Sequence, residues 1–301
     1  MIHQRALEYL LGLQGAALLR SFTEESDPGF GRARVAEMRR LLDRAELDVE
    51  PVAVERVSAV DGYRVWSRTY DEPGNGLFPP EEAAVHGILG GLPPGTAVDA
   101  ACGTGRHSAW LAGQGHRVIG VDGSPEMLER ARERVPSGEF HEAPLERLPI
   151  PDAHADIVVC SLALTHVRDL GPVFAEFARV LRPGGHLVVS DVARELAAIG
   201  SVPRVRVDGG RPALLVDHRH RASDYLGAAL PAGLRVVSCA EPRMSPPVPL
   251  DTPAELPDTL ETGVWDQWPW SLIGLTPEVC RAVTGDMPVL IIRHFRRDPD
   301  R

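Results

Sequence analysis

The sequence contains no lysine and only one asparagine, Asn75. Without lysine it cannot form the G-x-x-x-x-G-K-[ST] loop, whose lysine contacts nucleotide phosphates. The formal net charge is −10 and the pI is about 5.6, so the chain also lacks the excess of positive charge that binds a phosphate backbone. These absences argue against a P-loop nucleotide site and against a nucleic-acid partner.

Cysteine is scarce, and long apolar runs are absent. The four cysteines, Cys102, Cys160, Cys239 and Cys280, form no C-x-x-C pair, which favours buried thiols in a reducing cytosol. No stretch approaches about 18 uninterrupted apolar residues, and the first residues lack the cationic region of an export signal. We therefore expect a cytoplasmic protein that neither crosses nor binds a membrane.

A glycine-rich turn after a short apolar strand is the most informative feature that is present. Residues 97–105 read AVDAACGTG, and Asp122 ends the next apolar run. A dinucleotide site needs G-x-G-x-x-G, but no third glycine follows Gly103 and Gly105 at that spacing. Asp122 stands seventeen positions beyond Gly105, close to the spacing of about 20 at which a carboxylate meets ribose hydroxyls. The pattern indicates a pocket for a nucleoside without phosphates, and S-adenosylmethionine is the obvious candidate.

The periodicity of apolar residues predicts two parts. Helical spacing over much of residues 1–55 predicts an N-terminal helical hairpin, which could serve as a packing appendage, a lid or a dimer arm. In residues 56–301, near-continuous apolar strands alternate with helices, which predicts an α/β domain with a mostly parallel sheet. Within it, residues 193–220 insert a hairpin and residues 241–272 form a proline-rich, aromatic segment expected to bind substrate.

In combination, these motifs resemble the class I S-adenosylmethionine-dependent methyltransferases, in the methyltransferase type 11 branch that includes quinone-biosynthesis enzymes. The resemblance covers about residues 60–240. The pattern D-x-x-x-G-T-G begins at Asp99, V-D-x-S-x-x-M-L occupies residues 121–128, and L-R-P-G-G-x-L occupies residues 181–187. The resemblance implies S-adenosylmethionine as cofactor, S-adenosylhomocysteine as product, and a doubly wound, mostly parallel seven-stranded sheet of the Rossmann-like methyltransferase fold.

The same resemblance implies roles for particular residues. Asp99 would hold the methionine amino group, and Asp122 would accept hydrogen bonds from both ribose hydroxyls. Met127 would either pack on adenine or fill the core. The other residues expected at the cofactor are Ala101, Gly103, Thr104, Gly105, Gly123, Leu145 and Ser161. The family usually places an acidic residue against the adenine amino group, but Pro144 stands at that position, so backbone groups near Leu145 are expected to hold adenine.

His166 is the first candidate for a general base. It follows the fourth predicted strand, at the sheet edge where ligands bind, and an ordinary histidine pKa suits proton transfer. A structural role at the start of the next helix is the alternative. His218, at the end of the inserted hairpin, is the second candidate. The resemblance implies that Tyr70 reaches the methionine end or the acceptor. No metal is expected, because Asn75 lies outside the loop that would supply a magnesium ligand.

Tryptophans suggest the class of acceptor. Trp66 is expected to line the pocket, whereas Trp265, Trp268 and Trp270 form a W-x-x-W-x-W run that fits no amphipathic period. A flat aromatic acceptor stacked on this run is one hypothesis, and a plug of the core is the other. Some bacterial enzymes that methylate carbon 3 of indole share this general composition, so we expect an indole- or phenol-like acceptor.

The sequence therefore predicts a metal-independent methyltransferase that acts on a small aromatic molecule in secondary metabolism. A homodimer through the N-terminal helices stays open. The alternative from another class is a non-catalytic regulatory or assembly protein that binds S-adenosylmethionine or S-adenosylhomocysteine. An NAD-dependent oxidoreductase is disfavoured by the missing third glycine.

Overall fold

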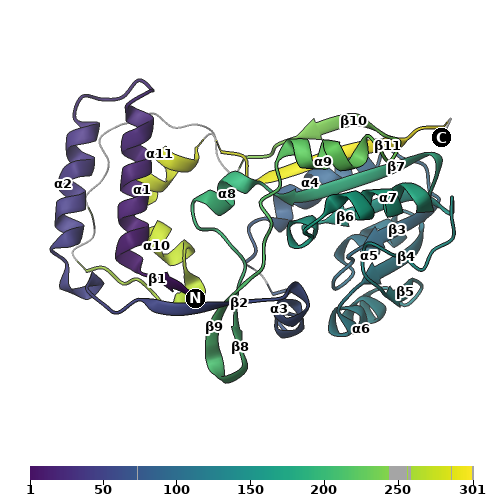
Figure 1. Ribbon diagram of the computed structural model, residues 1–301, viewed down its shortest axis with the longest axis horizontal. Helices are drawn as coiled ribbons and strands as arrows, with labels where there is room; N and C mark the ends of the chain where they lie inside the picture. The colour runs from purple at the N-terminus through teal and green to yellow at the C-terminus, as the bar shows by residue number, and fades with distance from the viewer. Residues whose placement is uncertain (73, 244–255, 257–258, 286, 300–301) are drawn as a thin grey trace. The chain divides into compact units, whose positions relative to one another are not determined.

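The computed structural model describes residues 1–72, 74–243, 256, 259–285 and 287–299. The chain forms two compact units (Figure 1). Unit 1 comprises Met1–Val57, Glu195–Leu215 and Arg243–Pro288. Unit 2 comprises Ser58–Arg194, Val216–Pro242 and Val289–Arg301.

Unit 2 is built on a seven-stranded sheet with the strand order β10-β11-β7-β6-β3-β4-β5. Its strands are β3 (Thr96–Ala100), β4 (Arg117–Asp122), β5 (Glu139–Glu142), β6 (Ala155–Ser161), β7 (Leu181–Val192), β10 (Leu234–Ala240) and β11 (Leu290–Arg297). Strands β3 to β7 are parallel, with Val98 of β3 opposite both Ile119 of β4 and Val158 of β6. Only β11 and β10 run antiparallel to their neighbours. This sheet confirms the predicted doubly wound, mostly parallel fold.

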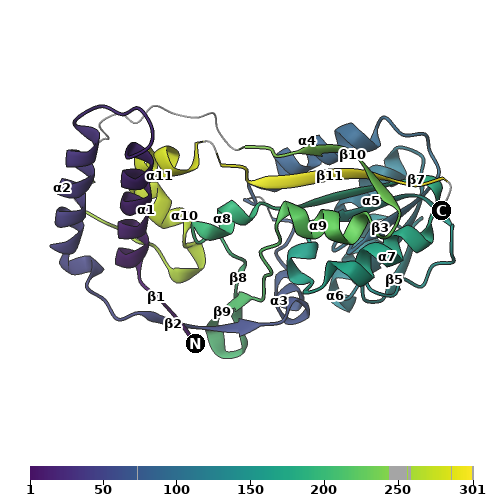
Figure 2. The same cartoon turned by 45° about the horizontal axis from the view of Figure 1, so that its top comes forward.

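Helices cover both faces of this sheet, because its strands carry apolar side chains on each face. The helices of unit 2 are α3 (Ala59–Trp66), α4 (Phe78–Leu89), α5 (Arg106–Gly113), α6 (Pro125–Arg134), α7 (Leu170–Val180) and α9 (Ala222–Ala229). On one face Val158 and Val189 pack with Phe174 and Phe177 of α7, and on the other Ile157 packs with residues of α4. Figure 2 shows α7 and α9 on one side of the sheet and α4 on the other.

The chain turns sharply where the parallel strands end. Ala101 after β3 has φ 58 and Leu162 after β6 has φ 54, a left-handed conformation that costs a residue with a side chain about 1–3 kcal/mol. Gly103 (φ +54) adopts the same region without that cost. A Cβ on Gly105 would lie 3.1 Å from Cα of Ala131, so glycine lets α5 begin close to α6. These turns form the sheet edge at which the site lies.

Unit 1 combines the N-terminal helices with a small sheet of order β1-β2-β9-β8. Its elements are β1 (Ile2–Gln4), α1 (Ala6–Ser21), α2 (Phe30–Leu42), η1 (Ala45–Leu47), β2 (Val52–Val57), α8 (Arg194–Ala198, which begins at the boundary), β8 (Arg204–Val207), η3 (Asp208–Gly210), β9 (Arg211–Leu215), η4 (Trp265–Gln267), α10 (Trp270–Leu275) and α11 (Pro277–Thr284). Its core joins Leu10 of α1 and Leu41 of α2 to Val54, Leu214 and Trp265.

This division corrects the predicted domain organisation. The N-terminal hairpin exists as α1 and α2, but the strands of the predicted insertion at 193–220 belong with it in unit 1, and not with unit 2. The physical reason is that β2 pairs with β9 in parallel, so that Glu55 lies opposite Ala213. The later part of the predicted segment 241–272 also belongs to unit 1, and its residues 244–255 and 257–258 lie outside the described residues.

Candidate active site

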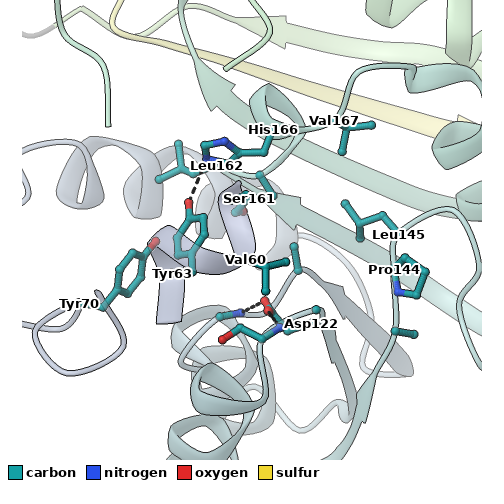
Figure 3. Close-up of a pocket in the computed structure, with 17 residues that line it drawn as sticks. Val60, Tyr63, Tyr70, Asp122, Pro144, Leu145, Ser161, Leu162, His166 and Val167 are labelled. Carbon is teal, nitrogen blue, oxygen red and sulfur yellow. Dashed lines mark hydrogen bonds between the residues drawn. The ribbon is translucent and has the colours of Figure 1, made fainter. Parts of the chain in front are cut away.

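A pocket lies in unit 2 at the carboxyl edge of the parallel strands (Figure 3). Residues after β3, β4, β5 and β6 form its floor and sides, and α3 and Tyr70 complete the wall. The predicted residues that line it are Tyr70, Ala101, Gly103, Asp122, Gly123, Leu145, Ser161 and His166. The sequence patterns therefore located the turns around the pocket.

Asp122, the last residue of β4, faces this pocket with a carboxylate that accepts two backbone hydrogen bonds. Its Oδ2 accepts a hydrogen bond from Gly103 N and its Oδ1 accepts one from Ser124 N, both at 2.8 Å. Burial raises the pKa of the Asp122 carboxyl, and these backbone donors oppose that rise. An ionised carboxylate has about four acceptor sites, so two remain for donors such as the two hydroxyls of a ribose.

The surroundings of Asp122 fit a nucleoside. A Cβ on Gly103 or Gly123 would meet no atom within 4 Å, so both backbones border open space. Ser161 also lines the pocket, and its buried Oγ has no hydrogen-bond partner among the described residues. Buried hydroxyls are usually paired, so this atom is suited to a polar group of a ligand. The residues present therefore fit S-adenosylmethionine.

His166 forms a hydrogen-bonded pair with Tyr63 at the opposite side of the pocket. The His166 Nδ1 lies 2.9 Å from the carbonyl oxygen of Val216, which can only accept, so Nδ1 carries the hydrogen. Nε2 is then free to accept from the Tyr63 hydroxyl at 3.3 Å, as the dashed line in Figure 3 marks. Burial lowers the pKa of His166 and raises that of Tyr63, so the imidazole is neutral and the phenol protonated at pH 7.

Tyr63 was not among the predicted site residues. It lies on α3, which Ser58 caps by accepting a hydrogen bond from Asp61 N at 3.1 Å. The one feature of the sequence that pointed to Tyr63 was its position seven residues before Tyr70. The two rings lie 5.9 Å apart, and burial raises the pKa of Tyr70 to about 12. Trp66 packs edge-on against Tyr63 at 5.4 Å but is not among the residues that line the pocket.

Four predicted cofactor residues lie beside the pocket and do not line it. Asp99 is buried and accepts a 2.6 Å hydrogen bond from Ser108 Oγ. Thr104 is bound to Asp71 and Arg134, Met127 fills the core with 1% of its surface exposed, and Gly105 packs against α6. For Met127 the structure therefore favours the core alternative over adenine packing.

His218 does not line the pocket either, but its segment supports the loop that carries His166. The His218 N–H donates to the Thr165 carbonyl at 2.6 Å, and His220 Nε2 donates to the Val167 carbonyl at 2.8 Å. With the bond from His166 to Val216, residues 216–220 hold three consecutive residues of this loop. His218 therefore helps to position the loop through its backbone, and its role as a second base stays a prediction.

The hypothesis that an acceptor stacks on the late tryptophans is wrong for Trp265 and Trp268. Both belong to the core of unit 1 and are 5% and 8% exposed. Their indole N–H groups donate to Gln4 Oε1 at 2.8 Å and to the Thr262 carbonyl at 3.0 Å. They are the core plug that was the alternative. Trp270 begins α10 and is half exposed.

Two kinds of feature are absent from the described parts of the chain. No group of three or more histidine, cysteine, aspartate or glutamate side chains there could hold a metal ion. No helix in those parts is both long and apolar enough to cross a membrane.

Comparison with known proteins identifies methyltransferases that are similar to this chain in sequence. The family described as "Methyltransferase domain" matches residues 98–189. An uncharacterised methyltransferase of Emericella nidulans is 28% identical over 61% of this chain and 78% of that protein. The malonyl-[acyl-carrier protein] O-methyltransferase of Serratia marcescens is 38% identical, over 41% of this chain and about half (49%) of its own length. A demethylmenaquinone methyltransferase of Beutenbergia cavernae is 34% identical over 50% of this chain and 62% of that enzyme.

Solved structures share the fold. An S-adenosylmethionine-dependent methyltransferase of Mesorhizobium loti has a TM-score of 0.50 at 23% identity, over 73% of this chain and 99% of that one. The complex of DhpI with S-adenosylhomocysteine has a TM-score of 0.52 at 21% identity, over 79% and 94%. The sheet, the glycine turn and the buried Asp122 are consistent with the fold of these structures, and residues 98–189 form a methyltransferase domain that is similar to those of the relatives above.

Proposed function

We propose that the whole chain transfers a methyl group from S-adenosylmethionine to a small aromatic acceptor of the indole or phenol type, without a metal. The observation that carries this proposal is the neutral His166 at the pocket, hydrogen-bonded through Nε2 to Tyr63. A neutral imidazole at this place can take the proton that an N–H, O–H or C–H acceptor loses when it is methylated.

The donor would be held by the floor of the pocket. Asp122 would bind the ribose hydroxyls, and the open backbones of Gly103 and Gly123 would let the ligand approach closely. When bound, S-adenosylmethionine supplies a methyl group that is already activated on a sulfonium. The protein therefore has to orient the acceptor, exclude water and accept a proton.

The hydrogen bonds of His166 favour such a proton transfer. The acceptor proton can pass to the Tyr63 oxygen while the Tyr63 hydroxyl proton moves to Nε2. The imidazolium that forms keeps its Nδ1–H bond to the Val216 carbonyl, which stabilises the positive charge. Apolar side chains, among them Val60, Leu162 and Val167, line the pocket nearby and help to exclude water.

An uncharged aromatic acceptor is supported by the rings gathered on this side. Tyr63 contacts both Trp66 and Tyr70 at ring-centre distances of 5.4 and 5.9 Å, and Tyr70 contacts Phe78 at 5.5 Å. Aromatic rings in edge-on or offset contact are favourable partners for a further flat ring. The same proposal includes natural-product biosynthesis in the cytoplasm as the setting of the reaction.

A homodimer through the N-terminal helices is a separate part of this proposal. Leu19 of α1, Phe22 just after it and Leu42 of α2 are 74%, 90% and 61% exposed. Exposed apolar side chains on or beside these two helices support contacts with a second copy. Sedimentation velocity tests this: a dimer that Phe22→Ser weakens is expected, and a monomer at all concentrations would contradict it.

The catalytic proposal is tested by incubating the protein with S-adenosylmethionine and a panel of indoles, phenols, anilines and carboxylic acids. Mass spectrometry should detect methylated indoles or phenols. His166→Ala should lower turnover by about 100-fold or more, with the affinity for S-adenosylhomocysteine kept. Binding without turnover across the panel would favour the non-catalytic alternative, and full activity of His166→Ala would refute its role as base.

A further inference from the structure

We propose that the purine end of the donor site does not recognise the 6-amino group of adenine, so that the chain accepts donor nucleosides altered at that position. The inference rests on the binding of S-adenosylmethionine in this pocket, and it concerns the residues that follow β5.

The position of Asp122 fixes which end of the pocket receives the purine. Strand β4, which ends in Asp122, lies between β3 and β5, and β6 lies beyond β3. In S-adenosylmethionine the purine and the sulfonium chain are attached to opposite sides of the ribose ring. Since the methyl group must lie toward His166, which follows β6, the purine lies toward the loop after β5 (Figure 3).

This loop presents only hydrocarbon side chains to the pocket. Ala143, Pro144 and Leu145 line it, whereas the preceding Glu142 is exposed and does not. Of the main-chain groups in this loop, the Ala143 N–H donates to the Asp122 carbonyl at 3.1 Å, and the Pro144 carbonyl accepts from Arg147 N at 3.2 Å. Proline itself has no N–H to offer.

The polar side chains that line the pocket lie elsewhere or are already bound. Ser124 Oγ donates to Glu126 at 3.0 Å and accepts from Met127 N, and Asp122 is committed to two backbone donors and the ribose. Ser161 ends β6 and His166 follows it, on the side of the methyl group, where Tyr63 and Tyr70 also lie (Figure 3). No described side chain of the lining is therefore placed to accept a hydrogen bond from a purine amino group.

Two ligands that differ only at this amino group test the inference by calorimetry. One is S-adenosylhomocysteine, and the other is its analogue with unsubstituted purine, which keeps every ring nitrogen. We expect their dissociation constants for the unaltered chain to agree within about threefold, because no side-chain hydrogen bond is lost. A preference of about tenfold or more for S-adenosylhomocysteine would overturn the inference.

Variants of the loop sharpen the test. Pro144→Asp would place a carboxylate at the purine edge and should raise the preference for S-adenosylhomocysteine by about tenfold. Pro144→Ala removes the proline ring without adding a carboxylate. It should therefore keep the ratio of the two dissociation constants that the unaltered chain shows. Circular dichroism checks that each variant is folded.

Other outcomes distinguish which assignment fails. If Pro144→Asp and Pro144→Ala give the same ratio, residue 144 does not face the purine, and the inference is wrong. If Glu142→Gln alters the ratio, the Glu142 carboxylate reads the amino group, which also overturns it. If a folded chain binds neither ligand, the donor assignment fails and this inference falls with it.

Discussion

At the scale of single residues, Asp122 links the glycine turn to the start of α6. Its two carboxylate oxygens hold the N–H groups of Gly103 and Ser124 and face the pocket with their remaining acceptor sites. Removing the carboxylate should therefore release both turns and remove the proposed contacts to ribose.

Asp122→Ala should weaken the binding of S-adenosylhomocysteine by about 100-fold or more, since two hydrogen bonds to a charged group are lost and each contributes about 1.5–3 kcal/mol. Calorimetry measures this directly. Asp152→Ala is a suitable control, because Asp152 has an exposed side chain in the same unit and does not line the pocket. Unchanged binding by Asp122→Ala would refute the ribose contact.

The pH dependence of turnover should identify the base. Burial lowers the pKa of His166 below its ordinary value of 6.5. Because only the neutral imidazole accepts a proton, kcat/KM should fall as the pH drops through this lowered pKa, with a midpoint below 6.5. His166→Ala should abolish this acid limb, whereas His218→Ala should keep it. A midpoint at or above 6.5 would argue against His166.

Spacing along the chain predicted the site better than it predicted side-chain direction. Asp122 and His166 end up at the pocket because each stands at or just beyond the carboxyl end of a strand. Asp99 lies one residue before the end of β3 and turns to Ser108 of α5. Sequence patterns give position along a strand, but which neighbour a polar side chain binds depends on helices that pack later.

At the scale of elements, a buried carboxylate connects α4 to α5 and β7. Glu81 is fully buried and accepts hydrogen bonds from Arg106 Nη1 at 2.7 Å, from His107 Nε2 at 3.1 Å and from Ser190 Oγ at 2.6 Å. Burial alone would raise the pKa of Glu81, but the bond from His107 and the charges nearby lower it to about 2. Its ionised form therefore stabilises the fold.

Glu81→Gln should lower the free energy of unfolding at pH 7 by about 3 kcal/mol, because it leaves Arg106 without its buried partner. A lowered folded-state pKa contributes stability above the ordinary value of 4.5, which is lost as the pH falls toward about 2. Urea unfolding measures this: the difference in the free energy of unfolding between the unaltered chain and Glu81→Gln should be smaller at pH 3.5 than at pH 7.

Glu82→Gln provides the matched control for this prediction. Glu82 also pairs with Arg106, at 3.0 Å, but its side chain is 36% exposed. Exposed pairs contribute about 1 kcal/mol or less. Equal losses for the two variants would show that burial of Glu81 does not govern this network.

The elements of unit 2 were predictable because local periodicity and end signals specify them. For example, β4 coincides with the apolar run before Asp122, and α6 begins directly after Ser124, whose side chain caps it. Strands β1 and β2 were not predicted. They are short, and β2 depends on pairing with β9, more than 150 positions away, which no local pattern encodes.

At the scale of the whole molecule, the pocket residues all belong to unit 2. A ligand that binds only the folded state stabilises it by RT ln(1 + [L]/Kd), about 2.7 kcal/mol at 100 times Kd. S-adenosylhomocysteine should therefore raise the calorimetric unfolding temperature of unit 2, and this shift should vanish in Asp122→Ala. Absence of any shift in the unaltered chain would contradict the donor site.

The most direct measurement for the whole account is a crystal structure of the chain with S-adenosylhomocysteine. We predict that both ribose hydroxyls bind Asp122, that the purine lies against Ala143, Pro144 and Leu145, and that the sulfur lies on the side of His166 and Tyr63. A nucleoside bound outside this pocket, or in it with the purine toward His166, would contradict the account.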